Sequence, residues 1–202
     1  RCSMDWSRLQ RAPLAAFDPQ TVAEYRHFFE LLRQKGVRIM LVLHHFAHPR
    51  WFENAGGWLS EDNVSVFMDY TRQTIENFGD LVDFWNTFNE PNVFALNGYF
   101  RGNFPPHKRN LAKAGRALKT MGKAHDVAYK YLKNCCPGKP VGISFNTGHF
   151  KGLNWLGKIP AAFTGWWFHR YAAKPFRQVD FWGLSYYAHV PFDPFPIDEV
   201  GR

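Results

Sequence analysis

Cysteine is scarce in this chain, which has 3 cysteines among its 202 residues. Cys135 and Cys136 are adjacent, so the spacing provides neither an even disulfide framework nor the CxxC pair of a zinc site. The sequence therefore excludes a disulfide-stapled scaffold. Cysteine usage of this kind is typical of a reducing compartment, so we expect a cytoplasmic location.

The chain also lacks long apolar runs and a recognisable start. No stretch approaches the ~18 apolar residues needed to cross a bilayer, so we expect no membrane partner. The chain opens at Arg1 without an initiator methionine, and no basic segment followed by an apolar one indicates a secretion signal. We therefore expect the true N-terminus to lie before Arg1.

The composition is that of a packed globular protein. Hydrophobic residues make up 46% of the chain, aromatic residues 18% and charged residues 21%, which excludes intrinsic disorder. The formal charge of +8 permits an acidic partner, and cations line one side of a predicted helix. Such a face is usually only solvated, and no aromatic residues are interleaved in it, so we expect no nucleic-acid partner. The cations are Lys113, Arg116, Lys119, Lys123, Lys130 and Lys133.

Helical patterns alternate with short apolar runs along the whole chain. The first helix is predicted after Asp18-Pro19 and ends at Gly36, a second begins near Ser60 and ends at Gly79, and a third covers about 112–132. This order indicates an α/β fold with parallel strands, joined by long loops over 91–111 and 147–178. The strands are predicted at 1–6, 37–43, 81–88, 141–145 and 179–187.

The clearest chemical signal is Asn89-Glu90-Pro91, a polar pair at the end of a predicted buried strand. Proline restricts the residue before it, so we expect an extended backbone at Glu90 with its carboxyl directed off the strand end. Every strand must end in polar residues, so the motif alone is weak. Other strand ends also carry hydrogen-bonding or aromatic groups, and their convergence at the mouth of a parallel barrel would suit a polyhydroxylated ligand. These groups are His44-His45-Phe46 and Ser185-Tyr186-Tyr187, and Arg1 lies inside the first predicted strand.

Four motifs in order resemble family 1 of the glycoside hydrolases, the β-glucosidase and 6-phospho-β-glycosidase group. Residues 1–8 are similar to the family's second strand, 43–51 with 56–58 to its third, 85–91 to its fourth and 180–187 to its sixth. The resemblance implies a partial (β/α)₈ barrel covering about strands 2 to 6, open rather than closed. We therefore expect residues 1–202 to form a single partial catalytic domain.

The resemblance also implies roles for individual residues. Glu90 matches the general acid/base, Asn89 the group that binds the sugar 2-hydroxyl, and His45 a donor to the sugar. Arg1 and Tyr187 match the pair that orients the nucleophilic carboxylate.

The chain departs from the family pattern at two positions of the site. Phe46 stands where a tryptophan wall is common, and it keeps the apolar face without the indole N–H. Ser185 replaces an asparagine, which shortens or removes one polar contact. Trp166 and Trp167 either flank the aglycone subsite or pack beneath their loop.

The nucleophile expected in a retaining glycosidase is missing. The second carboxylate should lie about 5 to 5.5 Å from the acid/base, and in the family it belongs to a Thr-Glu-Asn-Gly sequence that this chain does not contain. We therefore expect a fragment of a retaining β-glycosidase that binds β-linked saccharides, is inactive alone and needs no cofactor or metal. Metal binding by His44, His45 and His48 fits their spacing, but the resemblance argues against it. The alternative is a non-catalytic carbohydrate-binding barrel remnant.

Overall fold

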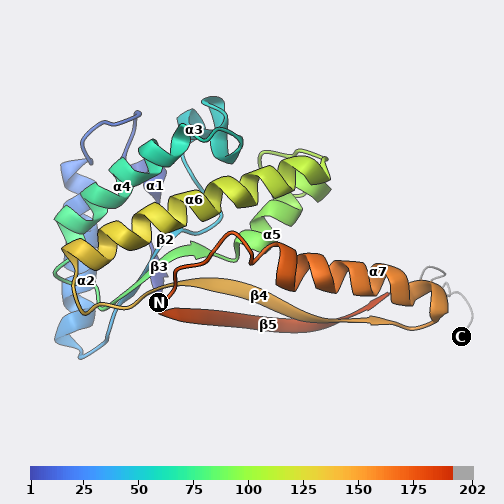
Figure 1. Ribbon diagram of the computed structural model, residues 1–202. Coiled ribbons are helices and arrows are strands. Elements are labelled where there is room, and N and C mark those ends of the chain that lie inside the picture. Colours follow the sequence, from blue (N-terminus) through green and yellow to red (C-terminus); the bar gives the residue numbers. More distant parts are fainter. Residues whose placement is uncertain (193–202) are drawn as a thin grey trace, which may run out of the picture.

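The computed structural model describes residues 1–192, which form a five-stranded parallel sheet in the order β1-β2-β3-β4-β5. Each strand pairs with the strand that precedes it in the sequence, so β1 and β5 are the two edges (Figure 1). The sheet is therefore open in the described part of the chain, as predicted. The strands are β1 (Cys2–Ser3), β2 (Met40–His44), β3 (Phe84–Asn89), β4 (Val141–Gly152) and β5 (Phe181–Phe192).

Helices connect the strands and cover the sheet. The long helix α6 packs over β3 and β4 beside α4, and α7 runs along β4 and β5 (Figure 1). No helix in residues 1–192 combines the length and the apolar character needed to cross a membrane. The helices are α1 (Trp6–Leu9), α2 (Pro19–Gln34), α3 (Arg50–Asn54), η1 (Gly57–Leu59), α4 (Asn63–Phe78), α5 (Pro91–Ala95), η2 (Leu96–Arg101), α6 (Leu111–Cys135), α7 (Trp155–Trp166) and η3 (Trp167–Tyr171).

Local capping explains where the first helices begin. The Asp18 carboxylate accepts a hydrogen bond from Thr21 N–H at 2.9 Å, and α2 ends before Gly36, whose φ of 72° suits glycine. The prediction of a strand over 1–6 is too long, because the Asp5 side chain caps a helix that starts at Trp6. The predicted cap at Ser60 is also wrong. Residues 57–59 form the short helix η1, so α4 begins only at Asn63.

The two long connections predicted as loops contain helices instead. α5 and η2 occupy the first, and α7 and η3 occupy the second. The sequence carried a signal for α7, since the Asn154 side chain accepts a hydrogen bond from Gly157 N–H at 2.8 Å. β4 and β5 are both longer than predicted and stay paired to Gly152 and Phe192, which makes a ribbon that extends beyond the other strands (Figure 1).

Aromatic side chains fill the core between the sheet and the helices. Trp58 is fully buried, and its ring lies 5.0 to 5.4 Å from the rings of Phe52, Phe67 and Phe88. Its indole N–H points at His44 Nε2, at 3.3 Å. Trp58 therefore connects the end of β2 with β3 and with the helices that cover them.

Asp83 ties α2 to the starts of β2 and β3. Its carboxylate accepts hydrogen bonds from Ile39 N–H and from the Arg33 guanidinium, each at 2.7 Å. Burial raises the pKa of Asp83, but the donors outweigh this effect, and the pKa lies below its ordinary value.

We expect Asp83→Asn to lower the free energy of unfolding at pH 7 by about 1 to 3 kcal/mol. A pKa depressed in the folded state stabilises the fold above the unfolded aspartate value of about 4, and the effect is lost as the pH falls through the folded pKa. The difference from wild type should therefore vanish in acid, as measured by urea unfolding at several pH values. Asp62→Asn is the matched control, because Asp62 is exposed and makes no capping hydrogen bond. Equal stability of the two variants at pH 7 would contradict the prediction.

Candidate active site

Glu90 is the single residue between the end of β3 and the start of α5. Its side chain is buried, with 5% of the residue exposed. The predicted extended backbone is wrong, because Glu90 has φ 44° and ψ 58°, in the left-handed region. One residue must turn the chain from a strand into a helix that begins with Pro91, and this turn overrides the preference for an extended backbone before proline. Hydrogen bonds from Glu90 N–H to Ser144 C=O (2.7 Å) and from Phe94 N–H to Glu90 C=O (3.0 Å) hold this turn.

The Glu90 carboxylate receives hydrogen bonds from two neighbouring strands. The Asn146 side-chain amide on β4 donates to Oε2 at 3.3 Å, and the Tyr187 hydroxyl on β5 donates to Oε1 at 3.3 Å. Tyr187 is otherwise exposed. Both partners are neutral groups, and each contacts a different oxygen of the carboxylate.

Asn89 and Arg1 form a second pair beside Glu90. The Arg1 guanidinium, just before β1, donates to Asn89 Oδ1 at the end of β3. Asn89 is buried, with 3% exposed, whereas Arg1 is exposed. The amide nitrogen of Asn89 faces no protein acceptor among the contacts of residues 1–192, so its two N–H groups remain available.

His45 follows the last residue of β2, at the same end of the sheet as Glu90. Its Nδ1 lies 3.2 Å from Ser3 Oγ. Burial lowers the pKa of His45 and the positive charge of Arg1 lowers it further, against the opposing effect of the Glu90 carboxylate. Phe46 has φ 65°, and its ring lies 5.4 Å from the His45 ring and 5.8 Å from the Phe104 ring. Asn89, Glu90 and His45 thus lie at the carboxyl ends of β3 and β2. Arg1 reaches this site from before β1, and Tyr187 reaches it from within β5.

The other two histidines of this segment turn away from His45. His48 lies between His44 Nε2, at 3.2 Å, and the Glu53 carboxylate, at 3.1 Å. Burial holds the pKa of His44 well below its ordinary value. Within residues 1–192, no group of three or more histidine, cysteine, aspartate or glutamate side chains is placed to hold a metal ion.

Two asparagines of the site were missed in the sequence analysis. Asn146 contacts Glu90, and Asn92 of α5 is fully buried against Asn146. Asn146 follows the predicted strand 141–145, so it lies at a predicted strand end just as Asn89 does. That signal was available. Asn92 gave no signal, because a polar residue two positions after Glu90 looks like any loop residue.

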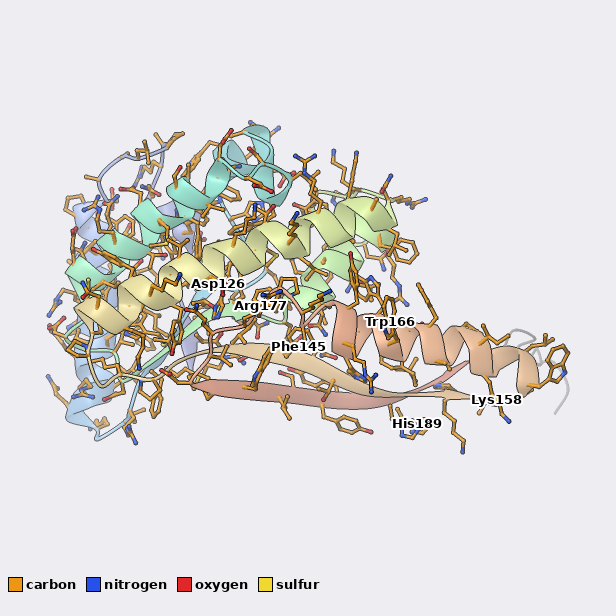
Figure 2. The ribbon with its side chains drawn as sticks, in the orientation of Figure 1. Asp126, Phe145, Lys158, Trp166, Arg177 and His189 are labelled. Carbon is orange, nitrogen blue, oxygen red and sulfur yellow. The ribbon has the colours of Figure 1, made fainter. Side chains whose placement is uncertain are left out.

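A hollow of about 810 Å³ lies between α7 and the β4–β5 ribbon. Phe145 from β4 and Trp166 from α7, labelled in Figure 2, are among the residues that line it. Side chains alternate along a strand, so Phe145 and Asn146 point to opposite faces of the ribbon. Asn146 contacts Glu90, so the hollow lies on the face opposite Glu90. Trp166 therefore does not face Glu90, whereas Trp167 is buried in the core.

Comparison with known proteins gives the family that the sequence motifs resemble. Residues 1–153 match the profile of glycosyl hydrolase family 1. The chain is 30% identical to the galactolipid galactosyltransferase SFR2 of Arabidopsis thaliana, over 93% of this chain and 33% of that protein. It is also 30% identical to beta-glucosidase A of Thermotoga maritima, over 75% of this chain and 34% of that protein.

A solved structure agrees with these sequence matches. The beta-glucosidase from Thermotoga maritima in complex with deoxynojirimycin superposes with a TM-score of 0.82 at 26% identity, covering 95% of this chain and 51% of that chain. The chain therefore spans about half of that structure and about a third of the two curated relatives. The predicted fold, a partial (β/α)₈ barrel that is open rather than closed, is confirmed. With its profile match over residues 1–153, this chain belongs to glycosyl hydrolase family 1.

Proposed function

We propose that this chain carries the acid/base portion of a retaining β-glycosidase, with Glu90 as the general acid/base. The observation that supports this most strongly is the placement of Glu90. A buried carboxylate at the carboxyl end of a parallel strand receives donors from the next two strands, beside a second polar pair, Asn89 and Arg1. In barrels of this kind, active sites lie at that end of the strands.

Glu90 would act in both chemical steps. In the first, protonated Glu90 gives its proton to the glycosidic oxygen while a nucleophilic carboxylate bonds to the anomeric carbon and the leaving alcohol departs. In the second, the Glu90 carboxylate takes a proton from water, the water oxygen bonds to the anomeric carbon, and the nucleophile is released. Two carboxylates perform both steps, so the mechanism uses no cofactor or metal.

The neighbouring residues would bind the sugar. Arg1 holds Asn89 Oδ1, which leaves the Asn89 N–H groups to donate to the sugar 2-hydroxyl. His45, whose pKa is lowered and whose Nδ1 contacts Ser3, would present Nε2 to another hydroxyl. Phe46 would supply an apolar wall against the ring of the sugar.

Arg1 and Tyr187 would orient the nucleophile in the complete enzyme. In the present structure they bind Asn89 and Glu90 instead, and both contacts of the Glu90 carboxylate are neutral groups. We therefore propose that these two side chains turn toward the nucleophile when it is present. We expect the 202-residue chain alone to leave an aryl β-glucoside intact, because no glycosyl-enzyme can form without a second carboxylate.

Glycosyl transfer to an acceptor other than water is a second candidate. The match to the galactolipid galactosyltransferase SFR2 covers 93% of this chain, whereas the family profile ends at residue 153 and the match to beta-glucosidase A covers 75%. The sequence similarity to the transferase therefore extends beyond residue 153, and the beta-glucosidase structure also superposes over 95% of this chain. Transfer uses the same first step, and a sugar hydroxyl then replaces water.

The proposal can be tested in a completed barrel, made by joining residues 1–202 to the remaining strands of beta-glucosidase A. We expect the β-anomer of the sugar to form first from an aryl β-glycoside, as followed by proton NMR, because two displacements at one carbon retain its configuration. Adding a galactolipid acceptor tests the second candidate, since a transferase would divert sugar to the lipid. Initial release of the α-anomer would exclude the retaining mechanism.

The other functional predictions stand as proposals. We favour an enzyme over a non-catalytic carbohydrate-binding remnant, because family membership and a buried Glu90 both support catalysis. The absence of a nucleic-acid partner and of a membrane partner, and a cytoplasmic location, remain predictions.

A further inference from the structure

We infer that Asn146 is a positioning residue for Glu90, held in place by Asn92, and that it determines which carboxyl oxygen carries the catalytic proton. This inference rests on the proposed role of Glu90 as the acid/base. It is carried by a chain of hydrogen bonds that runs from the first turn of α5 to β4 and back to the Glu90 carboxylate.

Asn92 fixes the backbone of Asn146 from both sides. Its side-chain N–H donates to Asn146 C=O at 2.8 Å, and its Oδ1 accepts from Asn146 N–H at 3.4 Å. Asn92 is fully buried, so it has no water to replace these bonds. The segment Glu90–Asn92 is also bound to β4 through Glu90 N–H and Ser144 C=O. Hydrogen bonds therefore tie residues 90–92 to residues 144–146.

The Asn146 amide distinguishes two oxygens that are otherwise equivalent. The terminal torsion of a glutamate is broad and two-fold, so a carboxyl group alone does not select which oxygen faces the substrate. An amide nitrogen only donates, so Oε2 serves as its acceptor. The carbonyl oxygen of a protonated carboxyl accepts better than its hydroxyl oxygen, so this contact favours the proton on Oε1. Oε1 is the oxygen that faces Tyr187, whose hydroxyl is able both to donate and to accept. The proton is thereby directed away from β4, toward the place Tyr187 occupies.

The first test compares two substrates in the completed barrel. We expect Asn146→Ala to slow hydrolysis of an alkyl β-glucoside by about 10- to 100-fold, because a misplaced acid loses proton transfer to a poor leaving group. Hydrolysis of a dinitrophenyl β-glucoside should change little, since that leaving group scarcely needs the acid. Asn92→Ala should produce the same selective loss. Asn97→Ala is the matched control, because the Asn97 amide donates to Val93 C=O and not to Glu90.

Several outcomes overturn the inference. An equal loss on both substrates would mean that Asn146 acts only on folding or binding, and an unchanged rate on both would mean that it does not position Glu90. Failure of the proposed function is distinguishable from these, because wild type and Glu90→Gln would then hydrolyse the alkyl β-glucoside equally.

A second measurement uses the 202-residue chain itself and does not depend on catalysis. We expect Glu90→Gln to move the side-chain amide NMR signals of Asn146, identified by their loss in Asn146→Ala, and to leave those of Asn97 in place. A charged acceptor moves an amide proton signal strongly, so replacing it with a neutral one is visible. Asn146 signals that stay unchanged would overturn the inference, whatever the activity of the completed barrel.

Discussion

In the completed barrel, Glu90→Gln is expected to reduce hydrolysis of an alkyl β-glucoside by about 10²- to 10⁴-fold, the usual contribution of general acid–base catalysis. Glutamine keeps the size of the side chain, and its amide is able to accept from Asn146 and to donate to the Tyr187 hydroxyl, so the loss would reflect the missing proton. A dinitrophenyl β-glucoside should still form the glycosyl-enzyme, which then accumulates because no base activates water. Steady-state rates on both substrates measure the effect.

Azide should restore turnover of the dinitrophenyl substrate in Glu90→Gln. A small anion attacks the intermediate without needing a base, and it yields a β-glycosyl azide that chromatography detects. Glu76→Gln is the matched control, because Glu76 is a surface partner of Arg72. Unchanged hydrolysis of the alkyl substrate in Glu90→Gln would remove Glu90 from the acid/base role.

Trp58→Ala is expected to lower the free energy of unfolding of the 202-residue chain by about 3 to 5 kcal/mol. The change empties the centre of the aromatic core and removes the N–H that His44 Nε2 accepts. Urea unfolding followed by circular dichroism measures it. Trp155→Ala is the matched control, because 72% of Trp155 is exposed, and its effect should stay within about 0.5 kcal/mol. A loss below about 1 kcal/mol for Trp58→Ala would show that the core repacks around the gap.

Periodicity predicted the elements of this fold better than it predicted their ends. The α/β alternation and the start of α2 at Pro19 were read from the sequence, because each depends on residues close together in the chain. The arrangement of the strands in a barrel was implied by the resemblance to the family. The cap predicted at Ser60 is wrong for a local reason. The residues just before Ser60 form the short helix η1, and Ser60 ends that helix instead of starting α4. The extension of β4 to Gly152 depends on pairing with β5, which lies about 40 residues later in the chain and cannot be read from either strand alone.

The site residues also fall into those that local sequence predicted and those that only the structure revealed. Glu90 and Asn89 were found because a strand end followed by proline is a local pattern. The left-handed backbone of Glu90 was not found, because a strand-to-helix turn of one residue becomes evident only when both elements have been placed. The role of Asn146 requires contact between residues 56 positions apart, so it appears only in three dimensions.

The strand order has a consequence for how the protein is made. Each strand pairs with the strand synthesised just before it, so the sheet is able to grow on the ribosome in the direction of translation. At roughly 5 to 20 residues per second, the stretch from Met40 to Phe84 takes a few seconds to synthesise. During each such interval, the newest strand is the unprotected edge of the nascent sheet. Biosynthesis therefore passes through a fixed series of partly built sheets, each with a different edge for chaperones to shield.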